Sequence, residues 1–592
     1  MAVTKSNDSP TKNFAVISPL HKHASSNTLS EGNRVLSTST NGWFGAVGSV
    51  AIRYGDKRYF EAKCLTNVRI YFGLSRVLNH NGQDIQDSAV VEGSANFDYM
   101  WRTTSDNEVY YQGSNQSATV SAVSVNDIVS CTTETNGTVK FYKNGTLIHT
   151  FSTTLTDGHI YYPIFSVNGA TSTERVQANF GTGDVTQQED GYALLTAADI
   201  LSLDGAPAIG DGNTHMQTTI HSGNSSSQTV TQRDRFTGDT AGFTPDWAWI
   251  KSRSFGNGAN AFDSVRGSDK GLAIFDSGAE DDQRDGVTFS SSGGKGTIAF
   301  TGEGDTGDIN ASSRTYVNHQ WLAGGAPTAD NTNGQTPTNN SVFRDGAAST
   351  TAFPSADIYP TRASINSTSG FSIISYTGNA TDGATLAHGL SSTPSIAFFR
   401  KRNTSQWTIH HDGLASGISG GRGLQWDVAD GQTNAFGAGY ADTFNANTCA
   451  LQDGSSSDAN VNDAAAYIAY FFTEVSGYSK FGFYEGNGVA ATGPFVELGF
   501  APQFLMIKNI DQNGDSFVVY DNVRETNNVV VEMWQPDQAA AAVTSSGFSI
   551  DFLSNGFRLR GAEANINKNN QTFIYMAFAE HPFAGSTPAT AR

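Results

Sequence analysis

The sequence contains little charge and almost no cysteine. Of its 592 residues, 16% are charged, and the only cysteines are Cys64, Cys131 and Cys449. They lie far apart and form no CxxC pair, so they cannot build a disulfide framework. We expect them to be small core residues of a protein made in a reducing cytoplasm.

Basic residues are also scarce. The chain has 36 Lys and Arg against 56 Asp and Glu, which gives a formal net charge of -20. Because nucleic-acid affinity rests on clustered Lys and Arg, this balance argues against nucleic acid as a partner. No apolar run approaches the roughly 18 residues that a membrane span requires, and the N-terminus lacks the apolar stretch of a secretory signal. We therefore expect no membrane insertion.

Long helical patterns are missing as well, and the composition favours strands. The chain has 62 Gly, 37 Phe and 20 Tyr, a mixture that suits short strands joined by tight turns. Its length exceeds the roughly 250 to 300 residues that one core supports. The sequence therefore predicts an all-β, multidomain protein. The best helical candidate is short, "DGYALLTAADIL" at 190–201.

Five β-prone blocks follow one another in the N-terminal third. They are "YFEAKC" (59–64), "YFGLS" (71–75), "DIVSCTTETNGTVKFYKNGTLI" (127–148), "YYPIFSV" (161–167) and "VQANFG" (176–181). Within the third block, Asn144-Gly145 is a strong hairpin signal. In order and spacing the blocks resemble a SPRY domain, a concanavalin-like antiparallel β-sandwich. We assign the sandwich to 31–182, an arm to 1–30, and a bridge with the short helix to 183–209.

Beyond residue 210 one pattern occurs three times. Each occurrence has a Gly-Asn turn, then a proline followed at once by a β-prone strand, and finally an apolar closing strand. From the proline to an aspartate the distance is 18, 18 and 19 positions, and to the closing aromatic 71, 73 and 71. The prolines are Pro245, Pro394 and Pro502, the aspartates Asp263, Asp412 and Asp521, and the aromatics Tyr316, Tyr467 and Phe573.

Spacings this constant predict three tandem β-sandwich-like modules. We assign them to 210–325, 363–475 and 476–583, with a C-terminal tail at 584–592. The extra residues 326–362 are rich in Gly, Asn, Thr and Pro. We assign them as a linker, and an ordered excursion over a neighbouring module is the open alternative.

The strand after the first proline reads "WAWIKSRS". Its alternation predicts Trp247, Trp249 and Lys251 on one face of the strand and Ala248 and Ile250 on the other. The basic end predicts that the strand emerges into solvent there.

The three aspartates Asp263, Asp412 and Asp521 are candidate site residues. A shared cation or ligand site is one interpretation, but a single carboxylate supplies too few ligands for Ca²⁺. We favour a structural role, either capping a turn or pairing with Lys251 or Lys508.

Two further features near these aspartates receive structural interpretations. His410 and His411 have no counterpart at the aligned positions of the other modules, so we interpret them as surface or strand-edge residues. The acidic segment 276–286 lacks the spacing of a calcium loop and predicts a solvated turn.

No motif in the sequence points to catalysis. GxSxG and HExxH are absent, and we predict a protein that is not an enzyme and needs no metal and no cofactor. Tyr99 and Trp101 lie in a loop-like stretch of the sandwich and are candidate ligand-binding residues, because aromatic rings stack on sugars. Anchoring of that loop is the equally favoured alternative.

A second resemblance spans nearly the whole chain. It rests on "WIKSRS" (249–254), "FDSVRG" (262–267), "YSKFGFYEGNG" (478–488) and "FLSNGF" (552–557). These blocks are similar to those of bacteriophage virion proteins, common in phages of marine bacteria, that join a SPRY-like domain to C-terminal repeats.

This resemblance implies a tail fibre or receptor-binding protein that contacts a bacterial surface glycan. It also implies a homotrimer, other virion proteins as partners, synthesis in the cytoplasm of the bacterial host, and a final location on the tail or capsid surface of the virion. A capsid-decorating or head-fibre protein is the alternative. A depolymerase tailspike is disfavoured, because the chain lacks the regular coils of a β-helix.

Overall fold

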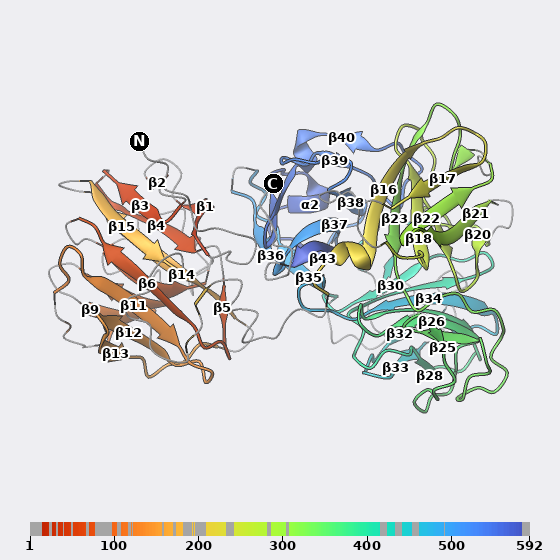
Figure 1. Cartoon of the computed structure of the whole chain (residues 1–592), viewed down its shortest axis with the longest axis horizontal. Helices are drawn as coiled ribbons and strands as arrows, with labels where there is room; N and C mark the ends of the chain where they lie inside the picture. Colours follow the sequence, from red (N-terminus) through yellow and green to blue (C-terminus); the bar gives the residue numbers. More distant parts are fainter. Residues whose placement is uncertain are drawn as a thin grey trace. The chain divides into compact units, whose positions relative to one another are not determined.

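The computed structural model consists of two compact units. The N-terminal unit is Met1–Ala206 and the C-terminal unit is Pro207–Arg592 (Figure 1). The residues described are 15–582 except 23–26, 31–32, 40, 49–50, 67–69, 77–97, 104–107, 117–119, 121, 157–158, 170–172, 181–191, 193, 196–208, 233–241, 281–285, 303–306, 415–422, 433–440, 453–460 and 491.

Two antiparallel sheets build the N-terminal unit, as the sequence predicts. The first sheet has the order β1 (Ile17–Lys22), β4 (Trp43–Gly48), β14 (Ile160–Asn168), β7 (Ile70–Ser75), β8 (Tyr99–Arg102), β9 (Glu108–Tyr111) and β10 (Ser114–Asn115), with β5 (Ile52–Arg53) also paired to β14. The second has the order β13 (Thr146–Thr150), β12 (Val139–Lys143), β11 (Ile128–Thr133), β6 (Tyr59–Cys64), β15 (Glu174–Asn179), β3 (Val35–Thr38) and β2 (Thr28–Ser30).

Aromatic side chains from the two sheets meet in the core of this sandwich. The ring of Phe60 on β6 lies 5.2 Å from that of Phe72 on β7 and 6.4 Å from that of Phe165 on β14. The predicted hairpin at Asn144-Gly145 joins β12 to β13, and both residues have positive φ, at 47° and 79°. All three cysteines are buried and none forms a disulfide, as predicted.

The sandwich begins earlier than predicted. Residues 1–30 are not an arm throughout, because β1 pairs with β4 and β2 pairs with β3. The predicted helix at 190–201 lies outside the described residues, apart from Tyr192, Leu194 and Leu195, which are not helical. The carbonyl of Leu195 accepts a hydrogen bond from the N–H of Ala15 at 2.8 Å, so this part of the bridge also packs against the sandwich.

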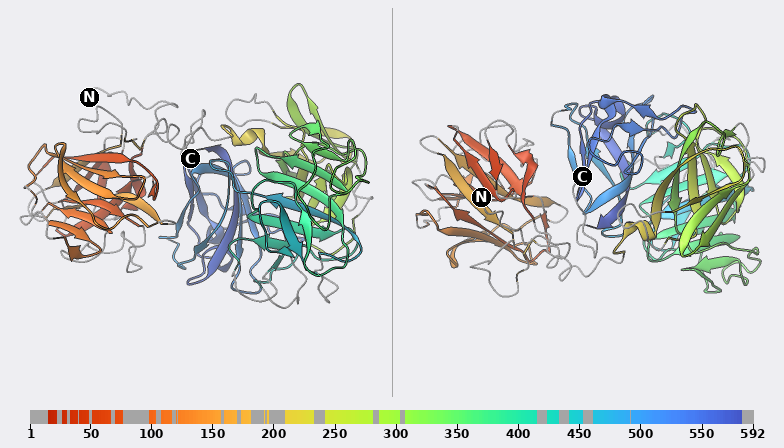
Figure 2. Two further views of the ribbon diagram at one scale, coloured as in Figure 1. Left: turned by 90° about the horizontal axis from the view of Figure 1, so that it is seen from below. Right: turned by 45° about the horizontal axis from the view of Figure 1, so that its top comes forward.

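The C-terminal unit contains three modules, each with a larger sheet and a three-stranded sheet (Figures 1 and 2). We call residues 209–325 the first module, 326–475 the second and 476–582 the third. In Figure 1 they are the yellow to green, green to cyan, and blue groups of strands.

The strands of each module are as follows. The first has β16 (Met216–Ser222), β23 (Thr315–Trp321), β18 (Trp247–Ser252), β19 (Asn260–Asp263) and β20 (Gly267–Ala273), then β17 (Gln228–Thr231), β22 (Lys295–Phe300) and β21 (Val287–Ser292). The second has β25 (Ala347–Ala348), β24 (Val342–Arg344), β26 (Arg362–Asn366), β27 (Phe371–Thr377), β34 (Ala466–Phe472), β29 (Ile396–Lys401), β30 (Thr408–His411) and β31 (Leu424–Gln425), then β28 (Ala384–Ala387), β33 (Thr448–Leu451) and β32 (Ala441–Asp442). The third has β35 (Ser479–Glu485), β43 (Thr572–Pro582), β37 (Phe500–Asn509) and β38 (Val518–Asp521), then β36 (Phe495–Glu497), β42 (Gly556–Leu559) and β41 (Ile550–Leu553), and a pair β39 (Glu532–Met533) and β40 (Val543–Thr544).

One strand order is common to the three larger sheets. It runs β16-β23-β18-β19 in the first module, β27-β34-β29-β30 in the second and β35-β43-β37-β38 in the third. Helices are short, namely η1 (Gly212–Thr214), η3 (Ser546–Phe548) and α2 (Ala564–Asn567). None of the helices in the described part of the chain is long and apolar enough to cross a membrane.

Both faces of β18 are buried, in two different cores. Trp247 and Trp249 join a hydrophobic core shared by all three modules, which we call the central core. Ala248 and Ile250 join the core between the two sheets of the first module. The predicted alternation is therefore confirmed, but the predicted emergence into solvent is wrong, because Lys251 is fully buried.

Residues 326–362 are an ordered part of the second module rather than a linker. β24 lies in this segment and pairs in parallel with β26. The side chains of Val342, Phe353 and Ile358 are buried in the core of the second module. Residues 326–362 are therefore the ordered excursion that we gave as the alternative to a linker. They pack on the second module, which follows them in the sequence.

Each predicted Gly-Asn turn closes onto a second asparagine. The main-chain N–H groups of Asn224, Asn379 and Asn487 donate to the side-chain oxygens of Asn310, Asn462 and Asn567 at 3.2, 3.0 and 3.0 Å. The turns are tight. A Cβ at Gly223, Gly378 or Gly486 would lie 2.1, 2.0 or 2.3 Å from a carbonyl oxygen, so a residue without a side chain is needed there.

Replacement of Gly223 tests this packing. Gly223→Ala is expected to lower the free energy of unfolding of the C-terminal unit by about 1 to 3 kcal/mol, because the new methyl group forces Ala311 and its neighbours to move. Gly302→Ala is the control, since nothing lies within 4 Å of a Cβ there. Urea unfolding of the two variants gives the comparison, and equal stabilities would contradict the expectation.

Candidate functional site at the joints between the modules

The predicted ligand-binding aromatics Tyr99 and Trp101 are not at the surface. Both lie in β8, with exposed fractions of 1% and 0%. Trp101 stacks over Phe141, and Tyr99 meets Phe151 edge-on. The prediction that these rings sit in a loop is wrong, because β8 is a short strand whose alternation points both of them into the sandwich.

Strand register identifies which residues are equivalent in the three larger sheets. Asp263 ends β19, Asp521 ends β38, and the third residue at this position is His411 at the end of β30. They pair with Trp247, Phe504 and Ile396, which each follow the module's proline by two positions. Asp412 is one residue further on and exposed. The prediction of three equivalent aspartates is therefore wrong for Asp412, and His411 is a buried residue of the pattern rather than a surface one.

Asp263 caps a turn and reaches the second module. Its Oδ1 accepts from the N–H groups of Val265 and Arg266 at 3.0 and 2.8 Å. Its Oδ2 accepts from Arg266 Nε at 2.5 Å and from the hydroxyl of Tyr470, on β34, at 2.6 Å. Arg266 and Asp263 are completely buried. The predicted turn-capping role is confirmed, whereas the charged partner is an arginine rather than the predicted lysine.

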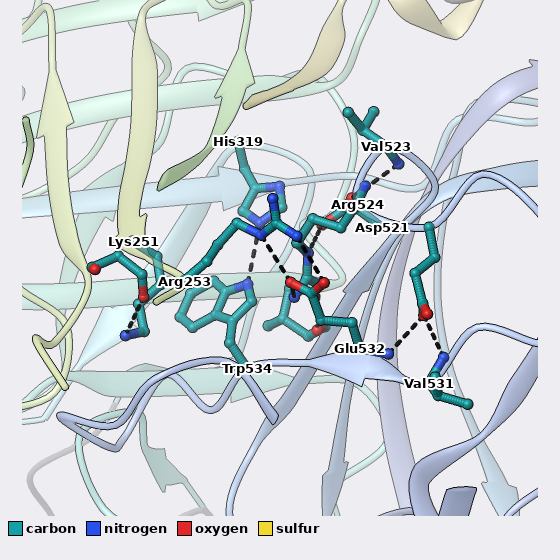
Figure 3. A network of polar contacts seen from close by, with 12 residues as sticks. Lys251, Arg253, His319, Asp521, Val523, Arg524, Val531, Glu532 and Trp534 are labelled. Carbon is teal, nitrogen blue, oxygen red and sulfur yellow. Dashed lines mark hydrogen bonds and ion pairs between the residues drawn. The ribbon is translucent and has the colours of Figure 1, made fainter. Parts of the chain in front are cut away.

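Asp521 makes the corresponding contacts in the third module. Its Oδ1 accepts from the N–H groups of Val523 and Arg524 at 2.9 and 2.8 Å, and its Oδ2 accepts from Arg524 Nε (Figure 3). Burial alone would raise the pKa of Asp521, but the charge of the Arg524 guanidinium holds it below its usual range. His319, on β23 of the first module, occupies the closing-strand position that Tyr470 has in the second module.

His319 is held as a neutral ring. Burial lowers its pKa to about 3. Its Nε2 accepts from Trp534 Nε1 at 3.3 Å, as Figure 3 shows, and its Nδ1 lies 2.9 Å from the hydroxyl of Thr218. The ring therefore links the first module to the third through uncharged hydrogen bonds.

His411 replaces the ion pair by neutral groups in the second module. Its Nδ1 accepts from the N–H of Gly413 at 2.8 Å, so Nε2 carries the proton and donates to the carbonyl of Tyr575, in the third module, at 3.1 Å. Burial lowers its pKa to about 4. Leu414, three residues further on, stands where the other two modules have Arg266 and Arg524.

A buried cation follows the proline by six positions in every module. These residues are Lys251, Arg400 and Lys508, with exposed fractions of 0%, 0% and 1%. Each donates to a carbonyl in its own module, at Asn257, Ser405 and Asp515. Each also donates to a carbonyl of another module, namely Ala540 in the third, Gly278 in the first and Ala429 in the second.

These contacts close the three modules into a ring. The first module donates to the third, the second to the first and the third to the second, so the contacts share one rotational sense and return to their start. We call the three contact regions the 1–3, 1–2 and 2–3 joints. Burial lowers the pKa of Lys251 to about 7 and that of Lys508 to about 8.

Main-chain hydrogen bonds repeat the same rotational sense. The acceptor in each case is the carbonyl eight positions after the proline. Arg253 O accepts from Ala542 N at 2.9 Å, Arg402 O from Glu280 N at 2.8 Å, and Ile510 O from Gln432 N at 2.8 Å.

Two of the joints also contain a bidentate ion pair. At the 1–3 joint, Arg253 donates to both oxygens of Glu532 at 2.8 and 2.7 Å (Figure 3). At the 1–2 joint, Arg402 donates to both oxygens of Glu280 at 2.9 and 2.6 Å. At the 2–3 joint Ile510 occupies the arginine position, so this pair has no counterpart there.

Most polar groups of the joints are satisfied within the protein, although Arg400 Nε is buried without a hydrogen-bond partner. Lys251 uses its three N–H groups on the carbonyls of Ser252, Asn257 and Ala540. Both oxygens of Asp263 accept hydrogen bonds from within the protein. Among the described residues, no three His, Cys, Asp or Glu side chains are grouped so that they could hold a metal ion. The joints therefore fix the relative positions of the modules.

The residues that close the ring were not predicted from the sequence. Glu280 lies in the segment predicted to be a solvated turn, yet it is largely buried and also accepts from Arg266 at 3.1 Å. One sequence feature could have indicated these contacts. A basic residue stands eight positions after the proline in two modules, Arg253 in the first and Arg402 in the second.

Comparison with known proteins covers both units. The family profile described as "Domain of unknown function (DUF7483)" matches residues 211–349 and 343–582. The profile of the SPRY domain matches residues 57–183, and the N-terminal unit contains a SPRY domain. No curated protein matches the chain.

Solved structures similar to part of the chain include SPRY domains. The SPRY domain of human HERC1 is 17% identical, with 27% of this chain and 96% of that chain covered and a TM-score of 0.22. A human SPRY domain is 15% identical, with 26% and 94% covered and a TM-score of 0.21.

Proposed function

We propose a function for this chain, which belongs to the family of the domain of unknown function (DUF7483), from its resemblance to phage virion proteins and from the geometry of its joints. It is a bacteriophage virion structural protein, a non-enzymatic tail fibre or receptor-binding protein that contacts a bacterial surface glycan. Its three C-terminal modules are copies of one β-module, a relationship supported by the common strand order and by the equivalent cations Lys251, Arg400 and Lys508.

The observation that carries this proposal is the closed ring. A rotation that relates the modules brings equivalent loops to the same side of the ring. The loops that follow the Gly-Asn turns, at 224–227, 379–383 and 488–490, are exposed; the first two are largely polar, and the third consists of Gly488, Val489 and Ala490. One chain thus presents three similar loops together.

Exposed loops with little charge suit a glycan better than a charged polymer. A chain with a net charge of -20 is repelled by anionic surface polymers at long range, although salt screens this repulsion beyond about 8 Å. Short-range hydrogen bonds from several loops to repeating sugar units add up, because the second and third contacts form at high effective concentration.

Chemical blocking of these loops tests the proposal. The native cysteines are all buried, so a cysteine introduced at an exposed position is selectively labelled. Coupling polyethylene glycol to Ser227→Cys, Asp382→Cys or Ala490→Cys is expected to reduce binding to immobilised bacterial surface polysaccharides at least about tenfold, by excluding the polymer from the ring face.

The matched control is Ser392→Cys, which is exposed beside Pro394 at the opposite end of β29. Its labelling should leave binding unchanged. Equal binding by all labelled variants would move the glycan site away from these loops, and no binding to any polysaccharide in a broad panel would remove the receptor-binding function.

The second candidate function is capsid decoration or a head fibre. The ring arrangement favours this candidate, because three modules packed side by side make the protein broader rather than longer. Antibody labelling of the virion in electron microscopy separates the two candidates by showing the protein on the tail or on the capsid.

The homotrimer remains a prediction. Its physical reason is lateral packing that stiffens linked sandwiches, and the three modules already provide that packing within one chain. Sedimentation equilibrium of the full chain at micromolar concentration measures the oligomeric state.

A further inference from the structure

The first strand of the third module, β35, forms an open edge of its sheet. It pairs with β43 on one side. On the other side, the described residues provide only an isolated bridge between Val475 and Ser479. Phe483, near the middle of this edge, has an exposed fraction of 66%, which is unusual for a large apolar side chain.

In the second module, another strand covers the equivalent edge of the sheet. Ser375 occupies the position of Phe483, because the two residues pair with the equivalent closing-strand residues Ile468 and Ile574. β26 pairs antiparallel with β27 along five residues, from Arg362 to Asn366. The exposed fraction of Ser375 is accordingly 5%.

Register also fixes the direction of the main-chain groups. The carbonyl of Ser375 accepts from the N–H of Thr361 at 2.7 Å, so its main chain points away from the closing strand. The N–H and C=O of Phe483, at the same register position, then point to the open edge. Unpaired main-chain groups beside an exposed aromatic ring are suited to receive a further strand.

We propose that β35 is a docking site for an extended segment of a different polypeptide, which adds as an antiparallel strand as β26 does to β27. This segment is basic, and it alternates small or β-branched apolar residues with polar ones, as "RASIN" in β26 does. The proposal does not depend on glycan binding by the ring.

The connection before β35 explains why the segment comes from outside the third module. The second module reaches its own edge with the long ordered excursion 326–362. Only residues 473–478 connect β34 to β35, and Tyr478 is already fixed by its contact with Phe578. This connection is too short to supply both a strand and its turn.

The charge near the edge favours a basic segment over a second copy as the occupant. Glu485 on the edge is exposed. The carboxylates of Glu474 and Glu497 lie close enough to Tyr575 to act on its hydroxyl, and this hydroxyl lies against Gly482. Lys480 is the one cation of β35. A second β35 brings one charge of each sign, Lys480 and Glu485, whereas a basic strand complements the carboxylates at this edge.

A peptide of residues 360–367, "PTRASINS", is the probe. It contains the strand that fills the equivalent edge of the second module. Added to the full chain, it is expected to slow hydrogen exchange of the β35 amides, measured by mass spectrometry, while the amides of β27, whose edge β26 already covers, keep their rates. The same peptide with Ser364→Pro cannot donate from the centre of the strand and serves as the negative control, because Ser364 pairs with Ile373 of β27 whereas the main chain of Ile365 faces β24.

Two substitutions in the protein separate main-chain docking from contact with the aromatic ring. Phe483→Pro removes the outward N–H without touching the hydrogen bonds to β43, and should weaken peptide binding at least about tenfold. Phe483→Ser keeps that N–H and copies Ser375, and should weaken binding only about threefold or less. Unchanged thermal unfolding establishes that both variants are folded.

Absence of protection at about 1 mM peptide, or equal binding by the Phe483→Pro variant, would overturn the proposal. Self-association of the chain that Phe483→Pro abolishes would overturn the choice of occupant. Because the readout is exchange at β35, it stays separate from the outcome of the polysaccharide experiment.

Discussion

Asp263→Ala is expected to lower the free energy of unfolding of the C-terminal unit by about 3 kcal/mol, because the buried Arg266 loses the nearer of its two carboxylate partners and keeps only Glu280. Arg266 has no water around it to replace the lost carboxylate, since it is completely buried. The hydroxyl of Tyr470 loses its acceptor at the same time. Urea unfolding followed by tryptophan fluorescence measures the loss, since six of the eight tryptophans lie in the C-terminal unit.

The second module supplies the matched control for this variant. It has His411 and Leu414 where the first module has Asp263 and Arg266, and its neutral groups are buried at the same positions. The double variant Asp263→His with Arg266→Leu is therefore expected to recover at least about half of the loss, because a buried pair replaced by neutral groups costs far less than a broken one. A single variant that loses less than about 1 kcal/mol would show that the pair is not a main stabilising contact.

The C-terminal unit is expected to lose stability steeply as the pH falls from 6.5 to 4. Burial lowers the pKa of five histidines from 6.5 to about 4 or below, namely His215, His221, His319, His388 and His411. Between pH 4 and 6.5 the unfolded chain therefore binds protons that the folded unit does not bind. Unfolding takes up protons in this range, so stability is greatest above pH 6.5 and falls with acidification.

Two buried carboxyl groups oppose this effect. Burial raises the pKa of Asp246 and Asp427 to about 6, so the folded unit binds two protons that the unfolded chain releases above pH 3.8. Five histidines against two carboxyl groups leave a net uptake of three protons near pH 5. At about 1.4 kcal/mol per proton and pH unit, the slope is about 4 kcal/mol per pH unit.

One histidine can be removed with little change of shape. The ring of His221 lies between those of Phe300 and Tyr316, at 4.8 Å from each. His221→Phe is expected to reduce the slope by about 1.4 kcal/mol per pH unit, whatever it does to the stability at neutral pH. Thermal or urea unfolding at pH 7, 6 and 5 measures both slopes. Equal stability at pH 7 and pH 5 would rule out neutral, buried histidines as the source of acid sensitivity.

The strands and modules could be predicted from the sequence because their signal is local. Alternation in "WAWIKS" depends only on neighbouring residues, and both faces of β18 are buried as that pattern indicates. The position of Asp412 could not be settled in the same way. The segment from Pro394 to His411 is one residue shorter than that from Pro245 to Asp263, so counting along the chain selected the aspartate next to the equivalent histidine.

The joints could not be predicted because each one joins residues that are distant in the sequence. Lys251 stands at the end of a strand and is followed by Arg253, and such a pair normally marks a solvated end. Its burial depends on Ala540, a residue without any side-chain signal. Tyr99 and Trp101 were wrongly predicted to lie in a loop, although they belong to a buried strand. A strand of four residues beside polar stretches gives too little periodicity to distinguish it from a loop.

The contact between Lys251 and Ala540 has a consequence for synthesis of the protein. The two residues are 289 positions apart, so a ribosome that adds roughly 5 to 20 residues per second makes Ala540 roughly 15 to 60 seconds after Lys251. During this interval Trp247 and Trp249 belong to a nascent chain that lacks Phe504 and Trp534, two of the rings that later pack near Trp249. The last module to leave the ribosome therefore completes the core of the first, and a chain that terminates early leaves the tryptophan-lined face of the first module open to aggregation.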